Sequence, residues 1–540
     1  MATIVPDPPV GLLSPPWRPV PSHPAPRHPA PVTTRPVASQ GCDPQPPPTP
    51  PEDPEDPTVT TPRRRQLVTF TVLTLAVASF TLLQSLIIPV LPLIQDHFDT
   101  TQSTSTWVLT AYLLSASVCT PLLGRIGDAY GKKRMMVIVL VALAIGSLMA
   151  ALALLVARVV QGLGGGVLPL SFGIIRDEFD DQRRGRALSI IASLAAVGFG
   201  VGIVLGGPIV EVLGYAWLFW LPMIATAIAA LGAAFLVPES PVLTPGGIPA
   251  TPAVLLAAWL VCLLLPVSQG NVWGWTSWPV LVLPALAVVL FVVWVVVELR
   301  ADVPLIDMAM MRRRGVWTAN LVAAGVGFGM FAAFGFLPQL LQTPTEAGYG
   351  FGATTTESGR LIAPSALASF LVGFVTAQLV ARLGARTVIL TGTLLNGLAF
   401  ASIALFHDQT WQLYAAITVQ GIGGGLVFSS LANVVIASVP AHQTGVASGM
   451  NANIRTIGGS IGSAVMAAIV TSSTGVGGFP LERGYTVGFL VLAGAMFVAA
   501  LASLRIPDIR AVDQEAVEDS TDLADEPADA SPAAVPVTSR

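Results

Sequence analysis

Charged residues are scarce in this chain of 540 residues: Asp, Glu, Lys and Arg make up 11% of it, against roughly a quarter in ordinary globular domains. Hydrophobic residues make up 53%, and the mean hydropathy is +0.71. A water-soluble fold has no way to bury that much apolar surface. The scarcity of charge therefore predicts a membrane protein, and the formal net charge of −4 gives no sign of a nucleic-acid partner.

Residues that bind metals or perform catalysis are also few. The three cysteines, Cys42, Cys119 and Cys262, lack the spacing of a disulfide framework or a zinc site. The five histidines fall in expected tails and loops, and no His/Asp/Glu constellation typical of an active site occurs. We expect no metal, no cofactor and no enzymatic activity. No apolar segment of a secretory signal peptide lies near Met1.

Long apolar stretches dominate the chain between Gln66 and Ile506, separated by short clusters of charge. Each is about 20 residues long, enough to span a bilayer as a helix. Helices are predicted because a helix satisfies its own backbone in lipid, and the alternating pattern of a membrane β-barrel is absent. The fourteen predicted spans are approximately 66–92, 104–123, 134–153, 155–175, 187–209, 216–236, 252–269, 278–297, 317–340, 360–380, 387–406, 411–437, 446–471 and 484–505.

An internal repeat divides the spans into two halves. The sequence Gln-Gly-Leu-Gly-Gly-Gly at residues 161–166 recurs as Gln-Gly-Ile-Gly-Gly-Gly at residues 420–425, an offset of 259. The repeat predicts two related six-helix bundles in parallel orientation, with spans seven and eight inserted between them. The expected organisation is a Pro-rich disordered tail, a first bundle, two inserted helices with an amphipathic loop lying on the membrane surface, a second bundle and an acidic disordered tail, at residues 1–65, 66–236, 237–316, 317–505 and 506–540.

Basic residues predict the orientation. Loops on the side of the two tails carry basic clusters, whereas the opposite loops carry only Arg360 and Arg483. The positive-inside bias therefore places both termini in the cytoplasm, in an inner or plasma membrane.

The loop between spans two and three, at residues 124–134, reads Gly-Arg-Ile-Gly-Asp-Ala-Tyr-Gly-Lys-Lys-Arg. Its glycines permit a close turn, its aspartate can cap a helix or pair with arginine, and its basic triplet attracts anionic lipid. This loop resembles the signature of the major facilitator superfamily, and the fourteen spans resemble its drug/proton antiporter branch. The resemblance implies a latch that secures the outward-open state, formed by Gly124, Asp128, Gly131, Lys132, Lys133 and Arg134. A simple topological anchor is the alternative.

Arg158 lies inside the fourth span, where a bare arginine costs about 2.5–3.5 kcal/mol. With Gln161 and Gly162 it resembles the superfamily's helix-four motif, which implies a part in proton transfer; snorkelling of Arg158 to the outer interface is the alternative. The central portions of all fourteen spans contain no Asp or Glu, so a mid-membrane carboxylate is not supported as the proton carrier. Glu211 and Asp96, near span ends, and Asp128 are the other candidates for coupling to protons.

Two departures from the family pattern weaken the inference of antiport. The fifth span holds a flexible motif similar to the family's, formed by Gly198, Gly202, Gly206, Gly207 and Pro208. It has Gly202-Ile203 where the family has Gly-Pro. In the first span, Gln84 stands at about the place of a membrane aspartate in many relatives, and glutamine cannot carry a proton.

The remaining polar residues within the spans are the candidates for a substrate cavity: Gln84, Tyr112, Asn320, Gln420, Asn433, Asn453 and Arg455. For each of them, hydrogen bonding between helices is the alternative. A cavity with few fixed charges suits hydrophobic or amphipathic substrates, so we expect export of drugs or secondary metabolites by alternating access. An importer or lipid transporter of the same fold, and a non-transporting sensor or scaffold, are the alternatives. The oligomeric state stays open, and a monomer is compatible with the sequence.

Overall fold

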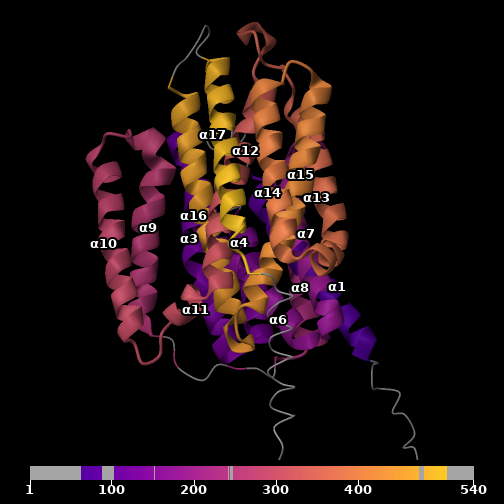
Figure 1. The fold of residues 1–540 in the computed structure, drawn as a ribbon, viewed down its shortest axis with the longest axis vertical. Helices are drawn as coiled ribbons and strands as arrows, with labels where there is room; N and C mark the ends of the chain where they lie inside the picture. Colours follow the sequence, from indigo (N-terminus) through magenta and orange to yellow (C-terminus); the bar gives the residue numbers. More distant parts are fainter. Residues whose placement is uncertain are drawn as a thin grey trace, which may run out of the picture. The chain divides into compact units, whose positions relative to one another are not determined.

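The computed structural model describes residues 62–87, 102–150, 153–240, 243, 247, 249–472 and 479–507, so Asp96 and all but residues 62–65 and 506–507 of the two predicted tails lie outside the described residues. Long helices run side by side through this part of the chain (Figure 1). The helices of the N-terminal half are α1 (Pro62–Ser85), α3 (Gln102–Tyr130), α4 (Lys132–Met149), α5 (Leu154–Gln161), η2 (Gly162–Gly166), α6 (Val167–Glu178), α7 (Asp181–Leu213) and α8 (Trp217–Leu236).

An inserted segment follows, and then the C-terminal half. The inserted helices are α9 (Ala250–Trp273), α10 (Trp278–Arg300) and the short α11 (Met308–Arg312). The helices of the C-terminal half are α12 (Arg314–Gln342), α13 (Thr355–Leu383), α14 (Ala385–Leu405), α15 (Thr410–Ala437), α16 (Thr444–Val470) and α17 (Glu482–Ser503). We call the end of the bundle that carries Arg63–Arg65 and Lys132–Arg134 the basic end, and the other end the opposite end.

Twelve of the described helical segments are long and apolar enough to cross a membrane, the segment Leu154–Glu178 counting as one. Two further long helices, α3 and α4, pack among them. The prediction of an all-α polytopic membrane fold is therefore confirmed. Most helix ends lie within a few residues of the predicted spans, but α1 ends seven residues early and α3 continues seven residues past its predicted end, to Tyr130. Residues 124–130 of the predicted loop are therefore helical, and Gly131 alone separates α3 from α4.

The fourth span differs from expectation because it is not a continuous α-helix. A 3₁₀ turn at Gly162–Gly166 separates α5 from α6. A Cβ atom at Gly162 would lie 2.4 Å from the Ser115 side chain, and one at Gly165 would lie 2.1 Å from Thr120 Oγ1, both on α3. The glycines therefore let α3 approach the backbone of this turn. In the second copy of the repeat, a Cβ atom at Gly421 would lie 2.2 Å from the Ser365 carbonyl oxygen of α13.

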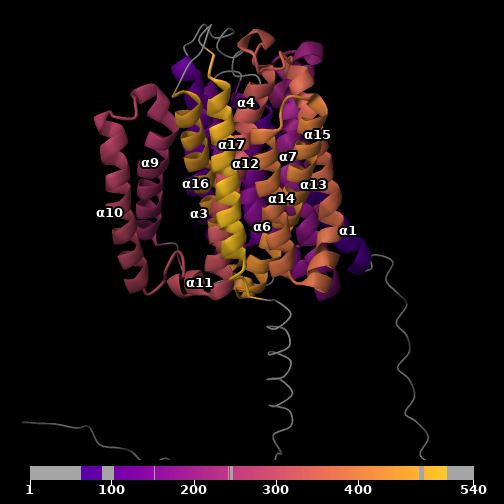
Figure 2. The same cartoon turned by 45° about the horizontal axis from the view of Figure 1, so that its top comes forward.

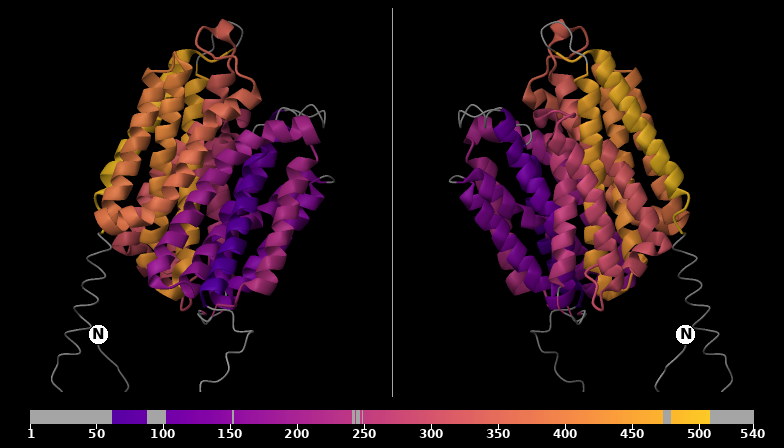
Figure 3. Two further views of the ribbon diagram at one scale, coloured as in Figure 1. Left: turned by 90° about the vertical axis from the view of Figure 1, so that its right-hand side faces the viewer. Right: turned by 90° about the vertical axis from the view of Figure 1, so that its left-hand side faces the viewer.

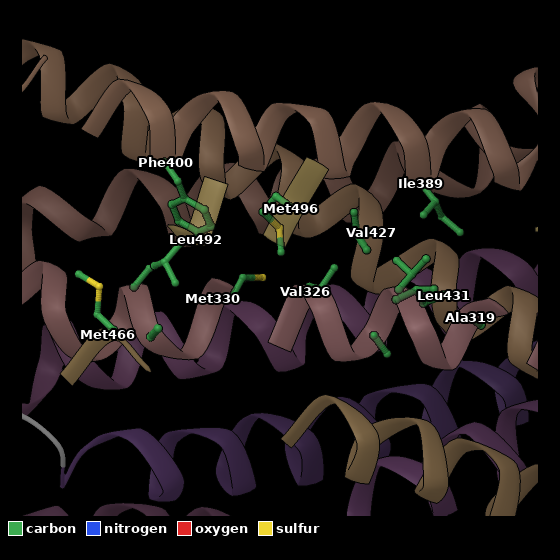
Figure 4. Close-up of a cluster of buried hydrophobic side chains, with 14 of the residues drawn as sticks. Ala319, Val326, Met330, Ile389, Phe400, Val427, Leu431, Met466, Leu492 and Met496 are labelled. Carbon is green, nitrogen blue, oxygen red and sulfur yellow. The ribbon is translucent and has the colours of Figure 1, made fainter. Parts of the chain in front are cut away.

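Each half has its own apolar core. One cluster of buried residues comes almost entirely from the N-terminal half, and a larger one comes from the inserted segment and the C-terminal half. Figure 4 shows part of the larger core, where Met330, Phe400 and Met496 lie close together among side chains of several helices. Figure 3 shows the two halves side by side, indigo to magenta and orange to yellow.

The inserted hairpin α9–α10 lies at the flank of the bundle (Figures 1 and 2). Its inner helix α9 packs against α3 and α16, and Gln269 Nε2 donates a hydrogen bond of 2.9 Å to Thr110 Oγ1 of α3. Most of α10 is exposed, as a helix facing lipid would be.

The loop after α10, for which the sequence predicts an amphipathic segment on the membrane surface, packs one side against the protein. Leu305, Ile306 and Met310 are buried in the larger core, whereas Ala309 and Arg312 are exposed, and the position of the segment at the membrane surface stays a prediction. The cause of the burial is Glu298, whose carboxylate accepts hydrogen bonds from the backbone N–H groups of Leu305 at 2.9 Å and Ile306 at 3.3 Å. These bonds fold the loop back onto the protein.

Candidate functional site

Asp128 joins the two halves at the basic end. Its buried carboxylate accepts hydrogen bonds from the backbone N–H groups of Gly445 at 3.3 Å and Val446 at 3.1 Å. Both groups belong to the first turn of α16, where free N–H groups and the helix dipole favour a negative charge. A Cβ atom at Gly124 would lie 2.4 Å from the carbonyl oxygen of Gly445, so glycine is needed for this close crossing of α3 and α16.

Lys132 stabilises the carboxylates at the basic end. Its Nζ is 2.6 Å from Asp177 Oδ2 of α6 and 3.8 Å from Asp128 Oδ1, and all three side chains are buried. Burial raises the pKa of Asp128, at the loop end of α3, to about 7, and Lys132 and the two N–H groups of α16 partly oppose this rise. The carboxylate is therefore held near its point of protonation.

The rest of the loop is fixed by Glu239, which follows α8. Gly131 has a φ of 111°, a conformation that favours glycine. The Glu239 carboxylate accepts a hydrogen bond of 3.3 Å from the backbone N–H of Lys133 and lies 3.6 Å from Arg134 Nε. The predicted latch residues thus lie together at the basic end. In the basic triplet, Lys132 is buried, Lys133 is partly exposed and Arg134 is exposed.

Arg176, Asn433 and Ser429 make further hydrogen bonds between the halves at the basic end. Arg176 Nη1 of α6 donates hydrogen bonds of 2.8 Å to the Ile436 carbonyl oxygen and to Thr444 Oγ1. Asn433 Nδ2 of α15 donates to Ser189 Oγ of α7 at 2.9 Å. At the opposite end, one such hydrogen bond is found among the described residues, from Thr356 Oγ1 to the exposed Glu211 at 3.3 Å. Polar contacts between the halves therefore concentrate at the basic end.

A cavity of about 100 Å³ lies between the two halves, and a smaller one of about 20 Å³ adjoins it. Four of the predicted cavity residues line the larger one: Gln84, Tyr112, Asn453 and Arg455. Aromatic rings and methionine supply much of the remaining lining, from Phe80, Met330, Phe331, Phe334 and Phe428. No carboxylate belongs to the described lining of either cavity.

Three other predicted cavity residues make hydrogen bonds between helices instead. Asn320 accepts from Asn451 Nδ2 at 2.9 Å, Gln420 accepts from Ser365 Oγ at 2.9 Å, and Asn433 contacts Ser189. These contacts agree with the alternative interpretation of polar residues within spans. None of the three lines the larger cavity.

Arg158 is fully buried next to the cavity wall. Its Cζ lies 5.7 Å from the centroid of the Tyr112 ring, a cation–π distance. Its Nε and Nη2 atoms have no hydrogen-bond partner in the described structure. Gln161 is buried on the same turn and donates to Ser147 Oγ at 3.3 Å. Burial of the Arg158 side chain does not agree with snorkelling.

The glycines of the fifth span pack against α1. A Cβ atom would lie 1.9 Å from Thr81 Oγ1 at Gly198 and 1.9 Å from Ser85 Oγ at Gly202. The helix α7 continues through Pro208. Close packing thus accounts for the two glycines without invoking flexibility.

The sequence did not predict the ion pair of Asp177 or the hydrogen bonds of Arg176 to the C-terminal half. Both residues belong to a charged cluster at the end of a span, and in the sequence such a cluster indicates only the orientation of the span in the membrane. An arginine next to an aspartate at the end of a span indicates that the two side chains have polar partners, but the sequence does not show which distant helix supplies those partners. The aromatic rings of the cavity look like ordinary apolar span residues in the sequence.

Comparison with known proteins places these features in a family. The model described as Major Facilitator Superfamily matches residues 73–345 and 319–535. The multidrug transporter protein MdtP of Bacillus subtilis (strain 168) is 27% identical over 382 residues, covering 69% of this chain and 70% of that protein. The cephamycin export protein CmcT of Amycolatopsis lactamdurans is 30% identical over 435 residues, covering 78% of this chain and 88% of that protein.

Among solved structures, that of the human organic anion transporter MFSD10 shares the fold. Its TM-score is 0.59 at 18% sequence identity, covering 82% of this chain and 100% of that chain. The family model spans more than half of the sequence, and residues 124–134 lie within its first matched range. The chain therefore belongs to the major facilitator superfamily.

Proposed function

We propose that this protein exports hydrophobic or amphipathic small molecules by alternating access. The observation that carries the proposal is the aromatic-lined cavity between two halves whose polar contacts concentrate at one end. Such an arrangement suits a site that opens to either side of the membrane in turn. The relatives named for multidrug transport and cephamycin export support a drug or secondary metabolite as the substrate class.

The direction of export depends on the orientation in the membrane. The excess of Lys and Arg at the basic end supports a cytoplasmic position for that end and for both termini. Contacts between the halves at a cytoplasmic end belong to a state that releases substrate on the outer side. The latch formed by Asp128 and the start of α16 then stabilises this state.

Proton coupling is part of the proposal, with the Arg158–Tyr112 pair as the candidate for the coupling element. No carboxylate of the described lining is available for this role, whereas Arg158 is buried, unpaired at two of its nitrogens and in contact with a cavity residue. Asp128 is the second candidate.

Transport into inverted membrane vesicles tests the function. Vesicles containing the protein and energised by an inward-acid pH gradient should accumulate a fluorescent hydrophobic dye faster than vesicles without it. Collapse of the gradient should remove the difference. Accumulation in right-side-out vesicles only would indicate import and contradict the proposal.

A further inference from the structure

Arg455 is the only charged residue of the described lining of either cavity. It lies on α16 and borders both the larger and the smaller cavity. Its Cζ is 4.8 Å from the centroid of the Phe428 ring. A cation–π contact of this kind offsets part of the desolvation of a guanidinium but does not neutralise its charge.

No protein carboxylate pairs with Arg455 in the described structure, where its guanidinium makes no ion pair. The sequence offers none nearby either, because the central portions of the spans contain no Asp or Glu. Charged side chains within membrane spans are costly and normally pair with a group of opposite charge. The described residues therefore offer Arg455 no counter-charge.

Further unpaired donors line the same cavity. The side-chain amide of Asn453 has no hydrogen-bond partner at either its nitrogen or its oxygen, and it is buried two residues before Arg455. On the facing half, the hydroxyl groups of Tyr112 and Ser117 of α3 are likewise buried without a partner. Buried polar groups are nearly always hydrogen-bonded, so these groups indicate a ligand rich in acceptor atoms.

The position of Arg455 is fixed by helix packing. A Cβ atom at Gly327 of α12 would lie 2.0 Å from the Arg455 carbonyl oxygen, and one at Gly458 would lie 2.1 Å from the Ala324 carbonyl oxygen. The backbones of α12 and α16 are thus in direct contact at this residue and about one turn after it. The cation is therefore presented by a rigid element, as a recognition group requires.

We propose that the substrate is an amphipathic organic anion whose carboxylate binds Arg455 and whose aromatic or apolar body packs against Phe80, Phe331 and Phe334. This proposal rests on the export function and specifies its substrate class. The carboxylate supplies the counter-charge, and its oxygens accept from donors on both halves of the protein. A guanidinium binds a carboxylate through two parallel hydrogen bonds, which gives the site its preference over neutral compounds.

Binding to the purified full-length protein in detergent tests the proposal with a matched series of probes. The series is 1-naphthaleneacetate, its neutral amide and a naphthyl-ethylammonium ion, which share the aromatic body and differ in charge. We expect the acid to bind at least about tenfold more tightly than the amide, since hydrogen bonds to charged groups are the strong ones. The ammonium ion should bind most weakly.

Variants of Arg455 separate recognition from folding. Arg455→Gln should lower the affinity for the acid at least about tenfold and leave the affinity for the amide within about twofold. Arg455→Lys should keep part of the preference, because it keeps the charge but loses the planar fork. Arg360→Gln, at an exposed arginine of the opposite end, is the charge-matched control and should bind all three probes as the wild type does.

Equal loss of acid and amide binding in Arg455→Gln would assign a structural role to Arg455 and overturn the proposal. Tighter binding of the ammonium ion, or no binding of the acid by a wild-type protein that exports a hydrophobic cation, would also overturn it and leave the export function standing. Acid binding in detergent without transport of any compound in vesicles would instead contradict the export function alone.

Discussion

Asp128 is the residue through which the two halves meet at the basic end. Its carboxylate accepts from two N–H groups of α16 and lies beside Lys132, in a site closed to water. Replacement of one carboxylate oxygen by an amide NH₂ group would remove the charge and place a donor against a donor. The chemistry of this single side chain therefore decides whether the contact forms.

We expect Asp128→Asn to lower transport in proteoliposomes at least about tenfold while the purified protein stays folded, because charge-assisted hydrogen bonds to α16 are lost. Asp302→Asn, the same substitution at an exposed aspartate between α10 and α11, is the control and should transport as the wild type does, because exposed charges contribute little. Wild-type transport rates in Asp128→Asn would show that the loop is only a topological anchor.

The raised pKa of Asp128, about 7 through burial, predicts a pH dependence of this contact. Opening of the contact exposes the carboxylate to water and returns its pKa toward the ordinary value, so the closed contact binds a proton more tightly than the open one and is stabilised as the pH falls through about 7. Spin labels at the exposed positions 183 and 386, one on each half, should therefore report longer distances at about pH 8 than at about pH 6. The Asp128→Asn variant should show no such dependence, and an identical response in both proteins would assign the effect to another group.

Arg158 is expected to matter for energy coupling more than for structure. Arg158→Ala should lower pH-gradient-driven transport, because it removes a buried cation with two unpaired nitrogens that contacts the cavity residue Tyr112. Substrate binding in the absence of a gradient should change much less. An unchanged rate under an imposed gradient would exclude Arg158 from coupling.

At the scale of elements, the close crossings of helices depend on glycine. The crossing of α3 and α16 holds Gly124 and Gly445 in backbone contact, and the glycines of the 3₁₀ turn η2 let α3 lie against that turn. The inserted hairpin α9–α10, by contrast, packs on the bundle mainly through α9 in the described structure. Glycine positions therefore set how closely the helices of the bundle approach one another.

Gly124→Val tests the crossing at the basic end. Its side chain would overlap the Gly445 carbonyl oxygen, which a Cβ atom alone approaches to 2.4 Å, so α3 and α16 should separate. We expect thiol reagents added from the basic end to reach cavity positions faster in this variant. Gly335→Val is the matched control, because a Cβ atom at this α12 glycine meets nothing within 4 Å. Equal accessibility in the two variants would contradict the role of the crossing.

At the scale of the whole molecule, the arrangement of polar contacts defines a conformational state. The halves are connected at the basic end by Asp128, Arg176 and Asn433, and at the opposite end by the exposed Thr356–Glu211 hydrogen bond within the described residues. Closure of one end around a cavity is what alternating access requires of each of its two end states.

The proposed orientation predicts which end is accessible from outside the cell. A cysteine at the exposed position 360, at the opposite end, should react with a membrane-impermeant thiol reagent in intact cells. A cysteine at the exposed position 386, at the basic end, should react only after the cells are opened. The reverse pattern would invert the topology and the direction of export. The two positions are matched in residue type, since both are arginines.

The sequence by itself determined the helices, their number and the family, because long uncharged runs, the repeat at residues 161–166 and 420–425 and the loop at residues 124–134 are local patterns. It also located Arg455 as a polar residue within a span. Tertiary structure alone decided which polar residues face the cavity: Tyr112 and Arg455 do, whereas Asn320 and Gln420 bond to neighbouring helices. It likewise decided the partners of Asp128 and Lys132, and turned the loop at Leu305 inward. The physical reason is that a span position fixes depth in the membrane but not the face of the helix that a distant segment will cover.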